Sequence, residues 1–168
     1  MTDERILSLG PNEGKAMFVL GDVVTFKLTG ADSNNAYFLT EIVSAPGGGP
    51  AFLHTHAPQE TFWILEGEYE VYGRDESGEK YAIPAVAGSM IHVPGNVPHG
   101  FRNVGDSTGK LIALYAPVVQ QFEFFNDIGV PMESSLEAPP YDQMPSVPRV
   151  LEVFAKHDMH LLEDLPEE

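Results

Sequence analysis

Three histidines and one glutamate are the residues of this sequence best suited to chemistry. His54 and His56 are two positions apart, so on an extended segment their side chains point to the same face. Glu60 follows after a turn that contains Pro58, and His99 comes much later. Imidazoles and a carboxylate suit a first-row transition metal and leave positions for water, dioxygen or substrate. Because the sequence has no cysteine, a thiolate-bound metal is excluded.

Glycines and prolines frame these residues at fixed distances. Gly48 lies six residues before His54, and Gly67 lies seven residues after Glu60. A second block follows a spacer of 20 residues, and its framing and polar positions are Gly88, Pro94, Gly95, Pro98, His99 and Asn103.

The two blocks resemble, in the same order, the two signature motifs of the cupin superfamily, and one copy of each suits a single-domain (type 2) cupin. The resemblance implies one divalent transition metal ion (Fe, Mn, Ni, Co, Cu or Zn) bound by His54, His56, Glu60 and His99. The second block departs from the family pattern at Asn96, where glycine is usual. Asparagine tolerates positive φ, so we expect the turn to be kept.

Short runs rich in β-branched and aromatic residues surround the two blocks and are separated by turn residues. The predicted strands are 23–28, 36–43, 62–65, 69–72, 81–83, 90–93 and 111–115. Many short strands with almost no helix between them predict an antiparallel barrel or sandwich. The cupin resemblance narrows this all-β class to a jelly roll, the double-stranded β-helix.

The last part of the chain differs in composition. Short helices are predicted at 118–128 and 147–156, with a proline-rich extended stretch, 138–148, between them. We therefore divide the 168 residues into a cupin barrel, 1–117 with its core at about 15–117, and an extension, 118–168, that packs on the barrel or on a partner subunit.

An apolar cluster in the extension contains Phe122, Phe124 and Phe125. It could cap the open end of the barrel, form a dimer contact, or pack against the outside of the barrel. Packing against the outside is the simplest interpretation.

Strand alternation predicts which side chains line a pocket at the metal. If the ligands face inward, so do the residues of the same parity, which are Phe52, Phe62, Ile64 and Phe101. This lining is aromatic and aliphatic, although the same residues could simply fill a small barrel. Arg102 has the opposite parity, so no cationic side chain faces inward from either block. That pattern argues against a small dianion such as oxalate and favours a flat, neutral or phenolic molecule.

Three further histidines lie outside the two blocks. We expect His92 to pack within its strand or to support a metal ligand from behind. His157 and His160 are three residues apart, which on a helix could bind a metal, but an exposed, solvated pair is the simpler interpretation.

Glu60 has two candidate roles. As a ligand it would temper the Lewis acidity of the metal, and when detached it would be a base whose pKa the walls of the site raise. The resemblance to quercetinase-like cupins implies a catalytic role, because the equivalent glutamate there is thought to deprotonate a flavonol hydroxyl before dioxygen adds and the ring opens.

The leading hypothesis is a metal-dependent dioxygenase of the quercetinase-like kind, acting on an aromatic, phenolic or enolisable small molecule. One alternative is a metal-dependent isomerase or lyase that consumes no oxygen. Another is a non-catalytic cupin that binds a small molecule. Fold alone does not choose among them.

Charge and composition exclude several classes of partner. With 25 acidic and 9 basic residues the formal net charge is −16, which disfavours nucleic acid and anionic membranes. No apolar run approaches a membrane span, the N-terminus lacks the features of a secretion signal, and cysteine is absent, so we expect a cytoplasmic protein. The expected partners are a small-molecule substrate and, as is common among cupins, a second copy in a homodimer.

Overall fold

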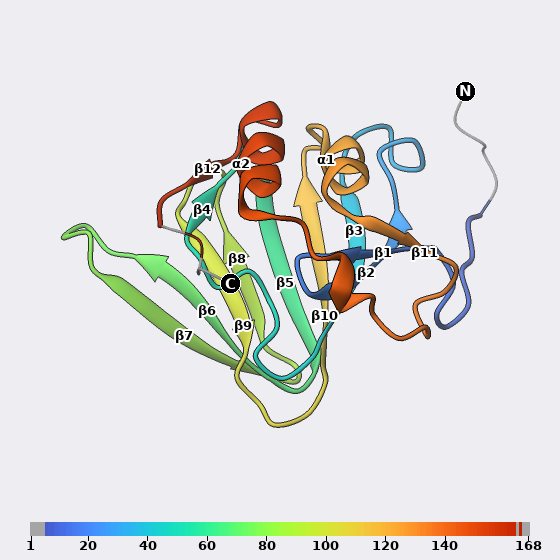
Figure 1. The fold of residues 1–168 in the computed structure, drawn as a ribbon, viewed down its shortest axis with the longest axis horizontal. Helices are drawn as coiled ribbons and strands as arrows, with labels where there is room; N and C mark the ends of the chain where they lie inside the picture. The colour runs from blue at the N-terminus through green and yellow to red at the C-terminus, as the bar shows by residue number, and fades with distance from the viewer. Residues whose placement is uncertain (1–5, 164, 166–168) are drawn as a thin grey trace.

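Two antiparallel β-sheets form the body of the protein in a computed structural model that describes residues 6–163 and 165 (Figure 1). The larger sheet has the strand order β11-β1-β2-β3-β10-β5-β8. Its strands are β1 (Lys15–Val19), β2 (Asp22–Leu28), β3 (Phe38–Ser44), β5 (Gln59–Glu66), β8 (Met90–Val93), β10 (Gly109–Ala116) and β11 (Val130–Met132). The smaller sheet has the order β12-β4-β9-β6-β7. Its strands are β4 (His54–Thr55), β6 (Glu68–Arg74), β7 (Lys80–Val86), β9 (His99–Asn103) and β12 (His160–Leu161).

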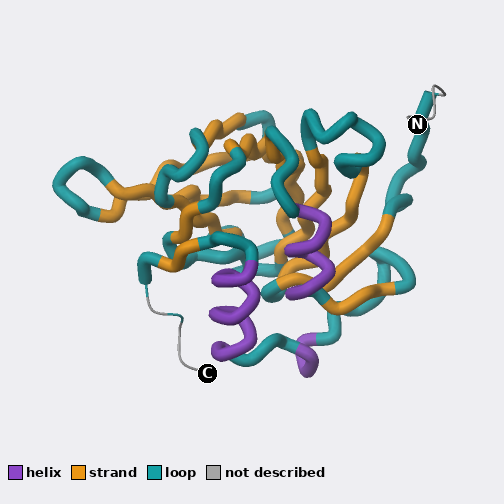
Figure 2. Tube along the Cα trace, turned by 90° about the horizontal axis from the view of Figure 1, so that it is seen from above, coloured by secondary structure: helices purple, strands orange, loops and turns teal. Residues whose placement is uncertain are grey.

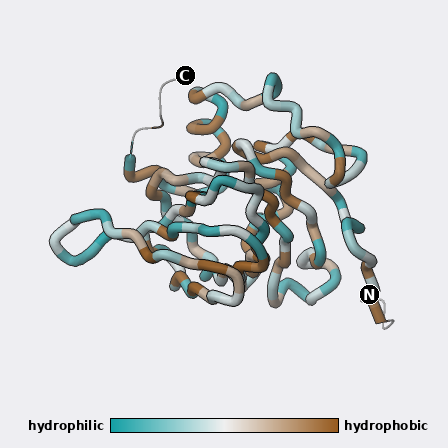
Figure 3. The backbone as a smooth tube through the Cα atoms, turned by 90° about the horizontal axis from the view of Figure 1, so that it is seen from below, coloured by the Kyte–Doolittle hydropathy of each residue, from teal (hydrophilic) through white to brown (hydrophobic). Residues whose placement is uncertain are grey.

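The apolar core lies between the two sheets. In β3 and β10 buried residues alternate with partly exposed ones along the whole strand, as expected when one face of a sheet meets the core. Phe38, Phe62, Tyr69 and Leu111 are among the largest fully buried side chains. By contrast, β7 is an edge strand that is exposed almost throughout, and the hydrophilic tip of the β6–β7 hairpin projects from the body (Figure 3). The predicted all-β jelly roll is confirmed.

Two short helices lie side by side at one end of the sheets (Figures 1 and 2). They are α1 (Gln121–Ile128) and α2 (Val147–Lys156), and a single 3₁₀ turn, η1 (Tyr141–Gln143), precedes α2. The prediction for α2 is correct, α1 starts three residues later than predicted, and the stretch predicted to be extended contains η1. Within the described residues, no helix has the length and apolarity needed to cross a membrane.

Five strands lie outside the predicted runs. Two of them, β4 and β9, carry histidines already expected on extended segments, and the others are β1, β11 and β12. The last two pair with β1 and β4 respectively, so the C-terminal extension adds an edge strand to each sheet. Strands of two or three residues are too short to show an alternating pattern, and their pairing depends on segments distant in sequence.

Candidate metal centre

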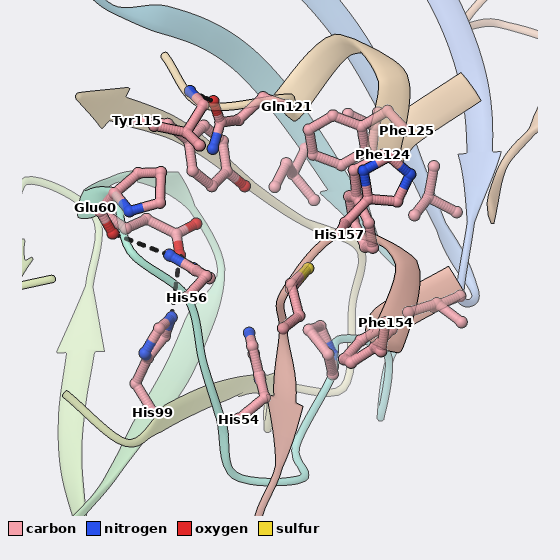
Figure 4. Close-up of a pocket in the computed structure, with 18 of the residues that line it drawn as sticks. His54, His56, Glu60, His99, Tyr115, Gln121, Phe124, Phe125, Phe154 and His157 are labelled. Carbon is pink, nitrogen blue, oxygen red and sulfur yellow. Dashed lines mark hydrogen bonds and ion pairs between the residues drawn. The ribbon is translucent and has the colours of Figure 1, made fainter. Parts of the chain in front are cut away.

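Strand pairing brings the two sequence blocks together. His54 in β4 lies directly opposite His99 in β9, so the first histidine of one block faces the histidine of the other. Glu60 is the second residue of β5 in the larger sheet, where it lies opposite Tyr115 of β10. His56 follows β4 and reaches the same place from the connection between the sheets. The structure therefore brings His54, His56, Glu60 and His99 together at the end of the sheets that the helices cover (Figure 4).

A tight turn fixes the approach to His99. Asn96 has φ 62°, and its N–H donates a hydrogen bond of 2.8 Å to the carbonyl of His56. Gly95 lies so close to the neighbouring chain that a Cβ there would be 2.2 Å from the carbonyl oxygen of Ala57. Glycine is therefore required at position 95 and asparagine supplies the positive φ at 96, so the expected turn is kept.

The three imidazoles share one arrangement. In each ring Nδ1 lies beside a backbone carbonyl oxygen two residues away in sequence. The distances are 3.2 Å from His54 to Phe52, 2.8 Å from His56 to Pro58 and 2.7 Å from His99 to Val97. Because a carbonyl only accepts, Nδ1 carries the proton, and Nε2 of the neutral ring keeps its lone pair. A hydrogen bond of this kind on the far nitrogen is the usual support of a metal-bound histidine.

The free ends of these groups converge. Oε2 of Glu60 lies 3.1 Å from Nε2 of His56 and 3.0 Å from Nε2 of His99 (Figure 4). A lone-pair nitrogen and a carboxylate oxygen do not hold each other at this distance unless a proton or a cation stands between them. Two ligand atoms bound side by side at about 2.1 Å from a metal lie about 3.0 Å apart. Candidate ligand atoms of His54, His56 and His99 lie within 4.8 Å of one another, so the donor set fits a transition metal ion.

Burial and mutual contacts set the charges of the site. Burial lowers the pKa of His54 to about 3, and its two histidine neighbours act in the same direction, so this ring stays neutral. Burial also lowers the pKa of His56, but Glu60 outweighs it and the net shift is upward. Burial raises the pKa of Glu60, but the hydrogen bonds to His56 and His99 outweigh it and hold the pKa below its usual range. The walls thus raise the Glu60 pKa as expected, but the two imidazoles that face the carboxylate reverse the net shift.

Tyr115 belongs to the same end of the cavity. It is 9% exposed and lines the cavity beside Glu60. Burial, and after it the Glu60 carboxylate, raises its pKa well above the usual value, so it remains a neutral phenol. The sequence carried a signal for it, since Leu111, Ala113 and Tyr115 share one face of a predicted strand. The amide of Gln121 also lines the cavity.

Two of the four predicted lining residues face the cavity. Phe62 and Phe101 line it, whereas Phe52 and Ile64 are not among the described residues that do. Ile64 is 1% exposed in the core between the sheets. Phe52 precedes the two-residue strand β4, so strand alternation does not extend to it, and its ring packs 5.7 Å from that of His54. Among the described residues that line the cavity there is no lysine or arginine, and Arg102 is exposed as expected.

The C-terminal extension covers this end of the cavity. Phe124 and Phe125 from α1 and Phe154 from α2 line it opposite the ligands (Figure 4). The simplest interpretation, packing against the outside of the barrel, is therefore wrong for Phe124 and Phe125. Phe122 is different, since it is 39% exposed.

The other histidines correct two expectations. His157 is not exposed: its side chain is 4% exposed and lines the cavity, with Nε2 2.6 Å from Oδ2 of Asp127 and Nδ1 3.1 Å from Oε1 of Gln120. His160 is exposed, as expected. His92 is exposed and lies 2.9 Å from the hydroxyl of Thr61, so it neither packs in the core nor supports a ligand.

Comparison with known proteins agrees with this architecture. Residues 41–115 match the model of the cupin domain family. No curated protein matches the sequence. Among solved structures, an RmlC-like cupin from Shewanella frigidimarina superimposes with a TM-score of 0.57 and 21% identity, over 73% of this chain and 99% of that chain.

Two similar structures are those of oxalate enzymes. An oxalate oxidase gives a TM-score of 0.50 and 22% identity over 58% of this chain and 52% of its own. The oxalate decarboxylase of Bacillus subtilis gives 0.51 and 15% over 64% of this chain and 31% of its own. The chain thus spans about half of the first enzyme and a third of the second, and at these identities the likeness shows the fold.

Proposed function

Given a cupin domain at residues 41–115, we propose that the protein is a metal-dependent dioxygenase of the quercetinase-like kind, acting on an aromatic, phenolic or enolisable small molecule. One observation carries the proposal. Three imidazoles anchored on the backbone and one ionised glutamate converge in a cavity with apolar walls and no cationic side chain among its described lining residues. His54, His56, Glu60 and His99 would hold the metal, which would supply Lewis-acid and redox chemistry.

Glu60 is the group that would handle the proton. It is an ionised carboxylate at 4% exposure, beside the neutral phenol of Tyr115. A carboxylate with a lowered pKa is a weak base, so it removes a proton only from a hydroxyl that is more acidic than a free phenol. An enolic or phenolic hydroxyl acidified by the bound metal meets that requirement.

The walls favour a flat apolar molecule. Phe62 and Phe101 from the sheets and Phe124, Phe125 and Phe154 from the helices supply aromatic surfaces, and α1 and α2 exclude water from one side. A small dianion would lie near Glu60 without a guanidinium or ammonium partner. For this reason we do not transfer the substrate of the oxalate enzymes to this protein.

The test begins with elemental analysis of untagged protein and continues with oxygen uptake on a panel of flavonols and other enolisable phenols. We expect close to one transition metal ion per chain, oxygen uptake with at least one phenol, and loss of uptake in Glu60→Gln. Turnover without oxygen uptake would replace the proposal with an isomerase or lyase. A ligand that binds and is returned unchanged under every metal would leave a binding protein.

A further inference from the structure

A second polar group lies in the same cavity. Asp22, the first residue of β2, lines it although its side chain belongs to neither sequence block. The residue is 3% exposed, and its Oδ1 has no hydrogen-bond partner among the described residues. Buried carboxyl oxygens in folded proteins are normally paired, so this one calls for an explanation.

The carboxyl faces the interior of the protein. Asp22 and Val24 are two residues apart in β2 and both line the cavity, as does Ile42 of the neighbouring strand β3. Two more buried hydroxyls near Asp22 also lack a partner among the described residues, those of Ser44 and Tyr69. Ser44 lies close enough to Asp22 and to Tyr69 to lower the pKa of both, so the three groups form one buried polar cluster inside walls that are otherwise apolar, with Oδ1 of Asp22 still short of a close partner.

Strand register places Asp22 far from the metal ligands. Val23, the neighbour of Asp22, pairs with Val43 of β3. Val43 pairs with Lys110 of β10, and Lys110 pairs with Glu66 near the end of β5. Glu60 lies at the start of β5, opposite Tyr115 of β10. Asp22 itself lies opposite Ser44, which pairs with Gly109, so the separation along β10 is six residues, on the order of 20 Å. The Asp22 charge contributes to the raised pKa of Tyr115, so this phenol lies between the two ends.

The protonation of Asp22 limits what it can bind. Burial raises its pKa to about 7, with the Ser44 hydroxyl and the Gly49 backbone offsetting part of the effect. Both forms of the carboxyl are therefore present near neutral pH. A hydroxyl pairs with either form, because it donates to a carboxylate and accepts from a carboxylic acid, whereas an ammonium group suits only the ionised form and an anion is repelled by it.

We propose that Asp22 anchors the end of the substrate remote from the metal ligands by a hydrogen bond to a hydroxyl group. The substrate class narrows to a hydroxylated aromatic molecule with one oxygen at the metal end and another hydroxyl at the Asp22 end. The aromatic character rests on the proposed function, but recognition of a hydroxyl by Asp22 needs neither a metal nor turnover.

Phenol and toluene test this anchor, because they have nearly the same size and differ in the hydroxyl. Calorimetric titration of the purified protein is expected to show phenol bound at least several-fold more tightly than toluene. Asp22→Leu should lower the preference several-fold, because it fills the same space without polar atoms and leaves only the metal end to bind a hydroxyl. Asp22→Asn should keep most of it, because the amide oxygen still accepts, and Glu60→Gln should keep it, because the anchor lies at the other end. Circular dichroism and thermal unfolding check that each variant is folded.

Equal affinities in the wild type, binding of neither probe, or a preference that is unchanged in Asp22→Leu would overturn the anchor. So would a preference lost only in Glu60→Gln, since the hydroxyl would then bind at the metal end. These outcomes are independent of oxygen uptake. A phenol preference that depends on Asp22, in a protein that takes up no oxygen, would retain the anchor and reject the dioxygenase.

Discussion

Buried histidines occur in two regions of this protein and are held in opposite ways. At the metal end, the rings of His54, His56 and His99 each rest on a backbone carbonyl through Nδ1. In the C-terminal extension, which forms the cover of the cavity, His157 contacts side chains through both ring nitrogens, Asp127 on one side and Gln120 on the other. The two regions face each other across one cavity (Figure 4).

The difference distinguishes a histidine that can bind a metal from a histidine that holds two helices together. A backbone carbonyl occupies one nitrogen, fixes the tautomer and leaves the other nitrogen free for a metal. His157 has no free nitrogen, and its partner Asp127 belongs to α1, so the ring joins the end of α2 to α1. Burial of a histidine therefore does not identify a ligand, whereas the nature of its hydrogen-bond partners does.

The largest expected effect is on metal content. His54→Ala and His99→Ala should each reduce bound metal from about one ion per chain to a small fraction, because a lost ligand opens the site and weakens the rest of the donor set. His157→Ala should leave the metal content unchanged. Elemental analysis by mass spectrometry of untagged proteins purified in parallel measures all three. Full occupancy in His99→Ala, or loss in His157→Ala, would erase the distinction between the two regions.

The pH dependence of metal binding is a second test of the difference between the histidines at the metal end and His157. Without metal, Glu60 raises the pKa of His56, so a proton occupies the position that the metal needs. A raised pKa means that this proton is bound below it and lost above it, so metal affinity should increase as pH rises through that pKa and then level off. The slope should approach tenfold per pH unit for each proton displaced. Competition against a chelator between pH 6 and pH 8 measures it, and a flat profile would contradict it.

A smaller effect is expected at the cover. His157→Ala should lower the free energy of unfolding by about 1–2 kcal/mol, because it removes a buried ring and leaves Asp127 without one of its partners. Lys156 and His157 lower the pKa of Asp127, so the ion pair stabilises the protein above the usual carboxyl range and is lost as pH falls through the lowered pKa. The difference between wild type and variant in urea unfolding should therefore shrink in acid. A constant difference would show that packing alone accounts for it.

The smallest effects are expected at the exposed histidines. His92→Ala and His160→Ala should change the free energy of unfolding by less than about 0.5 kcal/mol and leave the metal in place, because both side chains lie on the surface. They are matched controls for the two buried regions. A metal loss in His92→Ala would mean that the outer face of β5 and β8 supports the site after all.

The convergence of His54, His56, Glu60 and His99 could be predicted because their signal is local. Two histidines two residues apart and a glycine-framed block before His99 determine which strands must meet, and the pairing of β4 with β9 follows. The sequence pattern also placed Tyr115 and His157 on the same face as buried neighbours, but this pattern predicted no function for either residue. Tyr115 shares the face of Ala113, and His157 continues the helical spacing of Val150, Val153 and Phe154.

Other features could not be predicted from local pattern. Every residue in the first five positions of β2 is buried, so alternation does not distinguish Asp22 from its neighbours. Phe52 was misplaced because β4 is only two residues long, and alternation needs a longer strand. The strand β12 depends on the position of β4, which the sequence near residue 160 does not encode.

The pairing of β12 with β4 also determines when, during synthesis of the chain, this edge of the smaller sheet is closed. Leu161 lies opposite His54, and the carboxylate of Glu163 accepts a hydrogen bond of 2.9 Å from the N–H of Leu53. On the ribosome, all four ligand residues emerge about 60 residues before this closing strand. Until then the ligand strand is a free edge, open to solutes from the side. Synthesis of the four residues and closure of the strand edge beside them are thus separate events in the biosynthesis of the protein.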